Sequence, residues 1–165
     1  MFKTLAFDQS STKTGWSLFD GDTYIDSGVI DKHKISDTDK RVGEMGAAIC
    51  DKIEELKPDH VVIENIQQQS GVSTVILLAR LQGFILGWCY VHNIDVEIIG
   101  PSQWRAALKI KQGAGIKRKE LKAQSIEYVK NKYGLNVSED EAEAVCINDG
   151  ARARYMCDGE LWESF

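Results

Sequence analysis

Near its start the sequence reads Phe2-Lys3-Thr4-Leu5-Ala6-Phe7-Asp8, a short and mostly apolar run that ends in a carboxylate. Such a run is typical of a buried strand. Residues 15–19 and 24–30 have the composition of two more strands, and Asp20-Gly21-Asp22 between them is a strong hairpin signal. Residues 2–30 therefore predict three strands in hairpin succession.

The hydrophobic period changes after residue 37. Up to Pro58, apolar residues recur at three- and four-residue spacing and predict an amphipathic helix; they are Val42, Met45, Ile49, Ile53 and Leu56. A central strand is expected at His60-Val61-Val62-Ile63-Glu64, and a further strand at 94–99. Helices are expected at 72–92, 102–108, 117–133 and from residue 138 onward. This order predicts an α/β fold, with a mixed sheet and helices on its faces.

Length and composition indicate an ordinary globular protein: 165 residues, 43% hydrophobic and 27% charged. We expect one domain at 1–156 and a short tail at 157–165. The cysteines lie far apart without metal-ligand spacing, which is typical of free thiols in a reducing compartment. No export signal is recognised, and polar residues interrupt the apolar segment Val72–Val91. We interpret that segment as a buried or interface helix, and expect a cytoplasmic protein away from membranes.

Charge is distributed unevenly along the chain. The formal net charge is −5, but residues 103–132 contain nine Lys and Arg against two Glu, a local net charge of +7. A basic segment within an acidic protein can bind polyanions, because the local potential matters more than the total charge. A solvated helix surface is an equally good interpretation of this segment.

Two pairs of acids stand where they could meet. Asp8 and Glu64 each end an apolar strand, and open α/β sheets bind ligands at that edge. Asp140 and Glu143 are three residues apart in the first turns of the last predicted helix and share one face. Turn and helix-start preferences also explain these acids singly. Together they predict a Mg²⁺ site suited to two-metal phosphodiester hydrolysis, with ions about 3.5–4 Å apart.

Five segments resemble four motifs of the RuvC-type Holliday junction resolvases, which have the RNase H-like fold. The first-strand motif is similar to Leu5-Ala6-Phe7-Asp8-Gln9-Ser10-Ser11-Thr12-Lys13-Thr14-Gly15-Trp16, and the second acidic strand to Val61-Val62-Ile63-Glu64. The final acidic helix is similar to Asp140-Glu141-Ala142-Glu143-Ala144-Val145, and the basic region to Pro101-Ser102-Gln103-Trp104-Arg105 and residues 115–119. The residues of these motifs are most similar to those of resolvases from phages and their low-GC bacterial hosts.

The resemblance implies a five-stranded RNase H-like sheet and a metal-dependent endonuclease that cleaves branched DNA, Holliday junctions above all. It implies two Mg²⁺ ions per active site, with Mn²⁺ as a substitute, held by Asp8, Glu64, Asp140 and Glu143, with Asp8 bridging both. Lys119 would be catalytic, and DNA contacts would come from Lys119 together with Arg105, Lys111, Lys117, Arg118, Gln67 and Gln68. The helix at 72–91 would form a homodimer, which places two active sites on opposing strands.

Two departures from the family pattern bear on selectivity. Glu143 stands where Asp is usual, and Asn65-Ile66-Gln67-Gln68-Gln69 lacks the aromatic wedge of bacterial members. Glutamine stacks poorly on bases, so we expect recognition of branched shape with weak sequence preference. The alternative is that another aromatic residue, such as Trp104, supplies the stacking ring.

Other classes of protein share parts of this pattern. Actin-like ATPases and sugar kinases have a phosphate-binding hairpin similar to Asp8-Gln9-Ser10-Ser11-Thr12, but they need a second such domain and a second phosphate motif, which this sequence lacks. An RNase H-like nuclease for another nucleic acid, or a non-catalytic binding module, would keep the same fold. All four acids are present, which argues against the non-catalytic module.

Overall fold

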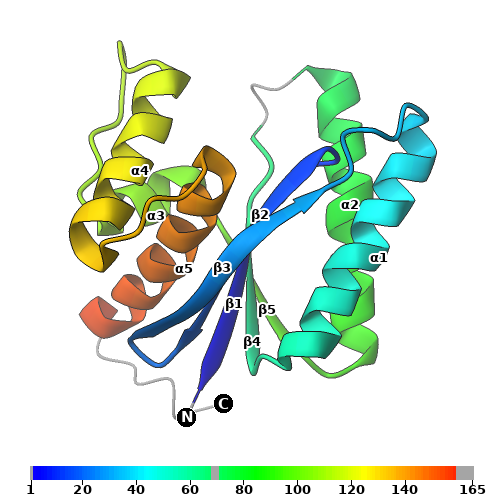
Figure 1. Cartoon of the computed structure of the whole chain (residues 1–165), viewed down its shortest axis with the longest axis horizontal. Coiled ribbons are helices and arrows are strands. Elements are labelled where there is room, and N and C mark those ends of the chain that lie inside the picture. The colour runs from blue at the N-terminus through cyan, green and yellow to red at the C-terminus, as the bar shows by residue number, and fades with distance from the viewer. Residues whose placement is uncertain (1, 68–70, 159–165) are drawn as a thin grey trace.

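The computed structural model describes residues 2–67 and 71–158. Its five-stranded sheet has the strand order β3-β2-β1-β4-β5 (Figure 1). Antiparallel neighbours are β1 (Lys3–Asp8), β2 (Lys13–Asp20) and β3 (Thr23–Asp31). The other two strands, β4 (His60–Glu64) and β5 (Asp95–Ile99), run parallel to β1. The predicted mixed five-stranded sheet is confirmed.

The hairpin between β2 and β3 turns at the predicted place. Asp20 pairs with Thr23, and Gly21 between them has a φ of +55°, in the left-handed region that favours glycine. The backbone N–H of Gly21 donates to the carbonyl of Phe2 at 2.9 Å. The turn is therefore tied to the start of β1.

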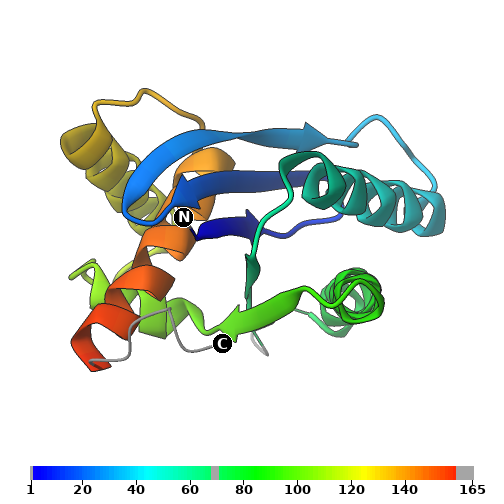
Figure 2. The same ribbon diagram turned by 90° about the horizontal axis from the view of Figure 1, so that it is seen from below.

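Helices cover both faces of the sheet (Figure 2). One face carries α1 (Thr38–Leu56) and α2 (Val72–Val91). The other carries α3 (Pro101–Ala107), α4 (Arg118–Tyr133) and α5 (Glu139–Asp158). The tail predicted at 157–165 is divided: residues 157 and 158 end α5, and residues 159–165 lie outside the described part of the chain.

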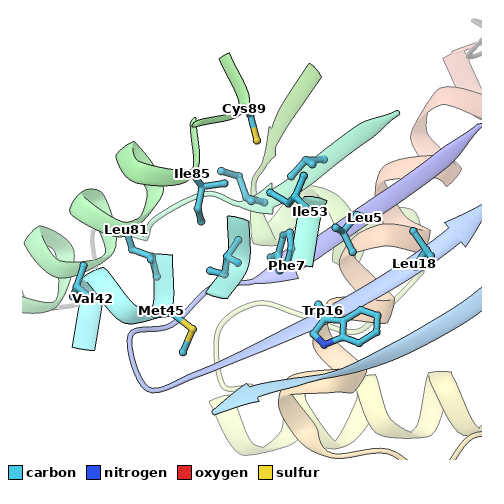
Figure 3. Close-up of a cluster of buried hydrophobic side chains, with 13 residues drawn as sticks. Leu5, Phe7, Trp16, Leu18, Val42, Met45, Ile53, Leu81, Ile85 and Cys89 are labelled. Atoms are coloured by element: carbon cyan, nitrogen blue, oxygen red, sulfur yellow. The ribbon is translucent and has the colours of Figure 1, made fainter. Parts of the chain in front are cut away.

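Successive residues of β1 serve opposite faces, as the period of a strand requires. Leu5 and Phe7 pack with α1 and α2, where Figure 3 shows them among the side chains of both helices. Ala6 between them packs with Val145 and its neighbours on α5. The strand is therefore buried on both faces, and only its last residue, Asp8, reaches the edge where a ligand can bind.

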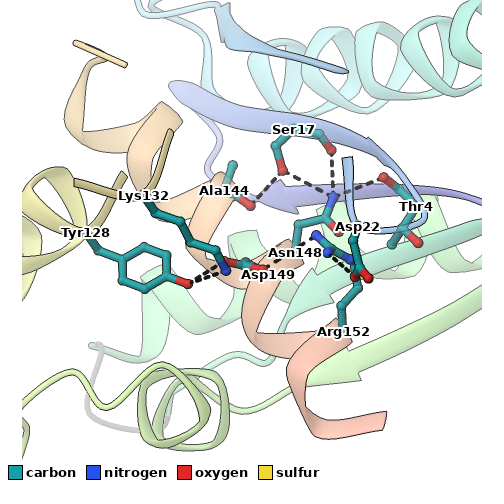
Figure 4. A network of polar contacts seen from close by, with 9 residues as sticks. All are labelled: Thr4, Ser17, Asp22, Tyr128, Lys132, Ala144, Asn148, Asp149 and Arg152. Atoms are coloured by element: carbon teal, nitrogen blue, oxygen red, sulfur yellow. Dashed lines mark hydrogen bonds and ion pairs between the residues drawn. The ribbon is translucent and has the colours of Figure 1, made fainter. Parts of the chain in front are cut away.

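Buried hydrogen bonds fix α5 on the sheet (Figure 4). Asn148 is 0% exposed, and its side-chain amide donates to the carbonyls of Thr4 and Ser17, each at 3.0 Å. The Ser17 hydroxyl donates to the carbonyl of Ala144 at 2.8 Å. Buried hydrogen bonds of this kind favour one arrangement of the elements that they join. They set the height of α5 relative to β1 and β2.

Charged groups further along α5 hold its neighbours. Asp149 accepts hydrogen bonds from the hydroxyl of Tyr128 and, at 2.6 Å, from Lys132, both on α4. Arg152 pairs with Asp22 in the β2–β3 turn at 2.7 Å (Figure 4). Asp149 and Arg152 are nearly buried and need partners for their charges, and these contacts connect α5 to α4 and to the hairpin.

The helix α2 leaves much of its apolar surface open. Val72, Ile76, Phe84, Tyr90 and Val91 are between 44% and 85% exposed. Among the described residues α2 is the one helix long and apolar enough to cross a membrane, with a mean hydropathy of 1.6 and 22% of that stretch buried. The segment was expected to be a buried or interface helix, and α2 is buried on one side, at Leu81, Ile85 and Cys89, and exposed on the other.

Candidate active site

The first acid, Asp8, ends β1 directly opposite Gly15 of β2. The start of α5 lies against that glycine: a Cβ on Gly15 would stand 1.9 Å from the carbonyl oxygen of Asp140. Only glycine allows so close an approach of helix to strand. Gly15 therefore brings the acids of α5 beside Asp8.

Glu64 ends β4, and its side chain and backbone are both held. The indole N–H of Trp104 donates to Glu64 Oε1 at 2.8 Å. The side-chain amides of Gln9 and Gln82, both nearly buried, donate to the backbone carbonyl of Glu64 at 2.9 and 3.3 Å. These contacts link the end of β4 to β1, α2 and α3.

The α5 acids face cations from two helices. Arg105 Nη2 lies 3.8 Å from Oε1 of Glu143, a residue that is only 9% exposed. Lys122 Nζ lies 4.0 Å from Glu143 Oε2, 3.8 Å from Asp140 Oδ1 and 3.0 Å from Glu139 Oε2. Lys122 thus hydrogen-bonds to Glu139, whereas Asp140 and Glu143 have their cations only at the long end of the salt-bridge range.

Crowding of the acids shows in their pKa values. Burial raises the pKa of Asp8 well above its usual value, and the charges of Glu143, Glu64 and Asp140 raise it further. Burial also raises the pKa of Glu64, against the hydrogen bond from Trp104. The pKa of Glu143 is raised by burial too, although Lys122, Arg105 and Arg118 lower it. Burial is therefore the main cause of the raised pKa values in this cluster, and at Asp8 the neighbouring acids add to it.

A cavity of about 580 Å³ opens at this cluster. Its acidic lining comes from Asp8, Glu64 and Glu143, and its basic lining from Arg105 and Arg118. Apolar side chains of α2, of α4 and of the loop before α4 also line the cavity; they are Leu77, Leu78, Ile116 and Leu121. An anionic group entering the cavity would meet the two guanidinium groups close to the carboxylates.

The donor set fits hard divalent cations. Among residues 2–67 and 71–158, no three His, Cys, Asp or Glu side chains already surround a common point. The carboxylate oxygens are turned instead toward Trp104, Arg105 and Lys122. Carboxylates are the ligands that Mg²⁺ takes in proteins, and the raised pKa values show that added positive charge would stabilise the cluster.

The structure brings the four predicted acids together, and the predicted cations only in part. Arg105 and Arg118 line the cavity, as does Gln67. Lys111, Lys117 and Lys119 are exposed and are not among its lining residues. Gln68 lies outside the described residues.

Sequence analysis missed four residues that hold the acids: Gln9, Gln82, Trp104 and Lys122. Gln9 follows Asp8 directly and Trp104 belongs to the basic region, so both residues were part of the motifs quoted from the sequence. Their contacts with Glu64 cross 55 and 40 residues, respectively, and no local pattern signals such a pairing. Trp104 is 1% exposed, which rules out the alternative that its ring stacks on a base.

A mixed five-stranded sheet with acids at the carboxyl ends of β1 and β4 and on the helix packed beside them defines a nuclease of the RNase H-like class. The comparisons with known proteins give its family. The family model "Crossover junction endodeoxyribonuclease RuvC" matches residues 4–147. The chain belongs to the RuvC family of divalent-metal-dependent nucleases. The predicted RuvC-type resolvase is confirmed, and the actin-like or sugar-kinase alternative is not favoured.

Individual relatives agree with this family. The RuvC of Orientia tsutsugamushi (strain Boryong) is 27% identical over 145 residues, 86% of this chain and 89% of that protein. The RuvC of Chlorobium phaeovibrioides is 27% identical over 115 residues, 67% of this chain and 61% of that protein. T. thermophilus RuvC, solved in complex with Holliday junction substrate, superposes with a TM-score of 0.75 at 16% identity over 96% of this chain and 97% of that one. At this identity the superposition shows the fold.

Proposed function

We propose that this chain hydrolyses phosphodiester bonds in branched DNA, Holliday junctions above all, at the cavity between β1, β4 and α5. The observation that carries the proposal is the convergence of Asp8, Glu64 and Glu143 on one cavity that Arg105 and Arg118 also line. Carboxylates bind metal ions, and guanidinium groups bind phosphate in a fixed geometry. Both halves of a nuclease site are therefore present.

Asp8, Glu64, Asp140 and Glu143 are the proposed ligands of two Mg²⁺ ions, with Mn²⁺ as a substitute. Bound divalent ions would activate water and stabilise the charge that develops on the phosphate oxygens. Asp8 is proposed as the ligand shared by both ions, as the family resemblance implies, and the charges of the other three acids all raise its pKa. Lys122 neutralises part of the charge of Asp140 and Glu143 before any ion binds.

Phosphate contacts are proposed for the residues that face or flank the cavity. Arg105 and Arg118 line it, and Arg118 is exposed at the first position of α4, where free backbone N–H groups favour anions. Lys111, Lys117 and Lys119 would extend the contact along the DNA backbone. Gln67 at the cavity, with Gln68, is proposed to contact DNA without a stacking ring, and shape selectivity with weak sequence preference follows.

A second copy of the chain is the partner proposed for the exposed face of α2. Its apolar residues form a surface that a monomer leaves in water at a cost. A lipid bilayer is the other partner of such a helix, but Arg80 lies at mid-helix and pairs with Asp39 at 2.8 Å. A charge at the centre of a membrane span costs about 2.5–3.5 kcal/mol or more.

A cytoplasmic location is also proposed. Buried free thiols at Cys50, Cys89 and Cys146 support it.

The test of the proposed activity is cleavage of a labelled four-way junction in Mg²⁺ by Asp8→Asn and Glu64→Gln variants. Each substitution removes one carboxylate charge and keeps nearly the same shape, so we expect cleavage to fall by more than tenfold while junction binding survives. The matched control is Asp51→Asn, an exposed carboxylate on α1 away from the cavity. Cleavage within tenfold of wild type by either active-site variant would contradict the assignment.

A further inference from the structure

Trp104 is buried, and its indole N–H makes a hydrogen bond to an acid of the cluster. The residue is 1% exposed, and α3 packs it between β4 and α5. A buried indole N–H needs a hydrogen-bond acceptor, and here the acceptor is Oε1 of Glu64 at 2.8 Å. A core tryptophan therefore touches a proposed metal ligand directly.

A glycine on α5 fixes the position of Trp104. A Cβ on Gly150 would stand 2.7 Å from Trp104 Cβ and 2.9 Å from its Cα and its carbonyl oxygen. This spacing is tighter than packed side chains tolerate, so α3 and α5 can cross this closely only at glycine. The position of the Trp104 backbone is thereby fixed relative to α5, the helix that carries Asp140 and Glu143.

The next residue on α3 reaches the other side of the cluster. The guanidinium of Arg105 lies 4.6 Å from the centre of the Trp104 ring and 3.8 Å from Glu143 Oε1. One short helix thus contacts Glu64 of β4 through Trp104 and Glu143 of α5 through Arg105. These two carboxylates come from different elements, and α3 relates their positions.

We propose that Trp104 is a positioning residue: its N–H holds Glu64 Oε1 and so presents the other carboxylate oxygen to the cavity for metal binding. This inference rests on the proposed function, in which Glu64 is a metal ligand. Groups that orient a metal ligand through hydrogen bonds usually contribute about 10–100-fold to metal affinity or activity. Burial of Trp104 means that this contribution comes without any contact with DNA.

The test compares Trp104→Phe with Trp16→Phe. Trp16 is also a buried tryptophan, but it belongs to the cluster on the opposite face of the sheet, under α1. In calorimetric titration with Mg²⁺ and no DNA, we expect Trp104→Phe to bind the ion about 10–100-fold more weakly. In cleavage assays its kcat should fall and its half-saturating Mg²⁺ concentration should rise, while KM for the junction stays within about twofold. Trp16→Phe should keep the wild-type Mg²⁺ affinity.

A second variant separates the N–H from ring packing. Replacing Trp104 by benzothienylalanine keeps the size and shape of the bicyclic ring and puts sulfur in place of N–H, so this variant should fold like wild type and reproduce the weakened Mg²⁺ binding. Wild-type Mg²⁺ affinity in this isostere would overturn the proposal. If the wild-type protein binds Mg²⁺ but cuts no branched DNA, the proposed function fails, while the calorimetric comparison still decides the role of Trp104.

Discussion

Asp8 follows three residues of β1 that are 0% exposed, and it lies among the other acids of the cluster. Its pKa is raised first by burial and then by the neighbouring charges, so the ionised form costs folding free energy when no metal is bound. In the folded state the proton is bound more tightly than in the unfolded chain. The metal-free protein therefore loses stability as the pH rises through the folded-state pKa of Asp8.

Asp8→Asn removes this cost together with the charge. In EDTA at neutral pH we expect the variant to unfold at a higher temperature than wild type, and a gain of about 1 kcal/mol would raise Tm by roughly 2–4 °C. The gain should shrink in acid, where Asp8 of the wild type is itself protonated. Thermal unfolding followed by circular dichroism across this pH range measures it, with Asp51→Asn as control. A lower Tm for Asp8→Asn at neutral pH would contradict this account.

Single residues also show what sequence alone could predict. Asp8 and Glu64 were predicted because each ends an apolar strand, and Asp140 and Glu143 because they share a helical face. Trp104 and Lys122 were not assigned to the acids, because their contacts depend on how α3 and α4 cross α5. For α3 the crossing depends on a close approach at Gly150, which no periodicity reveals.

At the scale of elements, α4 presents adjacent cations to different surroundings. Arg118 lines the cavity and acts on the pKa of Glu64 and Glu143. Lys119 is exposed and does not line it. The sequence predicted a catalytic role for Lys119, and that role stays a prediction. The position of Arg118 now adds a competing expectation for the same step.

Paired alanine variants decide between the two cations. If Arg118 holds the phosphate at the acids, Arg118→Ala should lower kcat by about tenfold or more, and Lys119→Ala should mainly weaken binding. Each lost phosphate contact should also reduce the slope of log K against log salt by about 0.9. Single-turnover cleavage and binding at several salt concentrations separate these effects, with Lys130→Ala near the far end of α4 as control. A larger fall in kcat for Lys119→Ala would support the original assignment instead.

Most element positions followed from hydrophobic period, and α1 shows why. Its buried residues include Val42, Met45, Ile49 and Ile53, the spacing that predicted it. The helix α2 was harder to interpret, because the sequence of an apolar helix does not show whether all of its sides are buried or one side is exposed. Only its position on the sheet shows that one side packs against α1 and the other remains open.

At the scale of the whole molecule, each chain carries one set of the four proposed metal ligands, whereas resolving a four-way junction requires cuts on two opposing strands. A dimer through α2 would supply both sites in a fixed relation. The apolar face of α2 would then be buried against its own symmetry mate, so a substitution there acts twice per dimer. A charge placed on that face would be desolvated in the dimer but not in the monomer.

Ile76→Lys on α2 and Ile25→Lys on β3 form a matched pair, since the two isoleucines are 47% and 50% exposed. Both variants should fold, because both lysines reach water in the monomer. Ile76→Lys should raise the dimer dissociation constant by about tenfold or more, since about 1.4 kcal/mol of desolvation cost corresponds to tenfold. Ile25→Lys should leave this constant unchanged, and sedimentation equilibrium measures both. On a junction labelled on opposing strands, Ile76→Lys should accumulate singly nicked product in place of paired cuts. Unchanged association and paired cutting in Ile76→Lys would place the interface between chains away from α2.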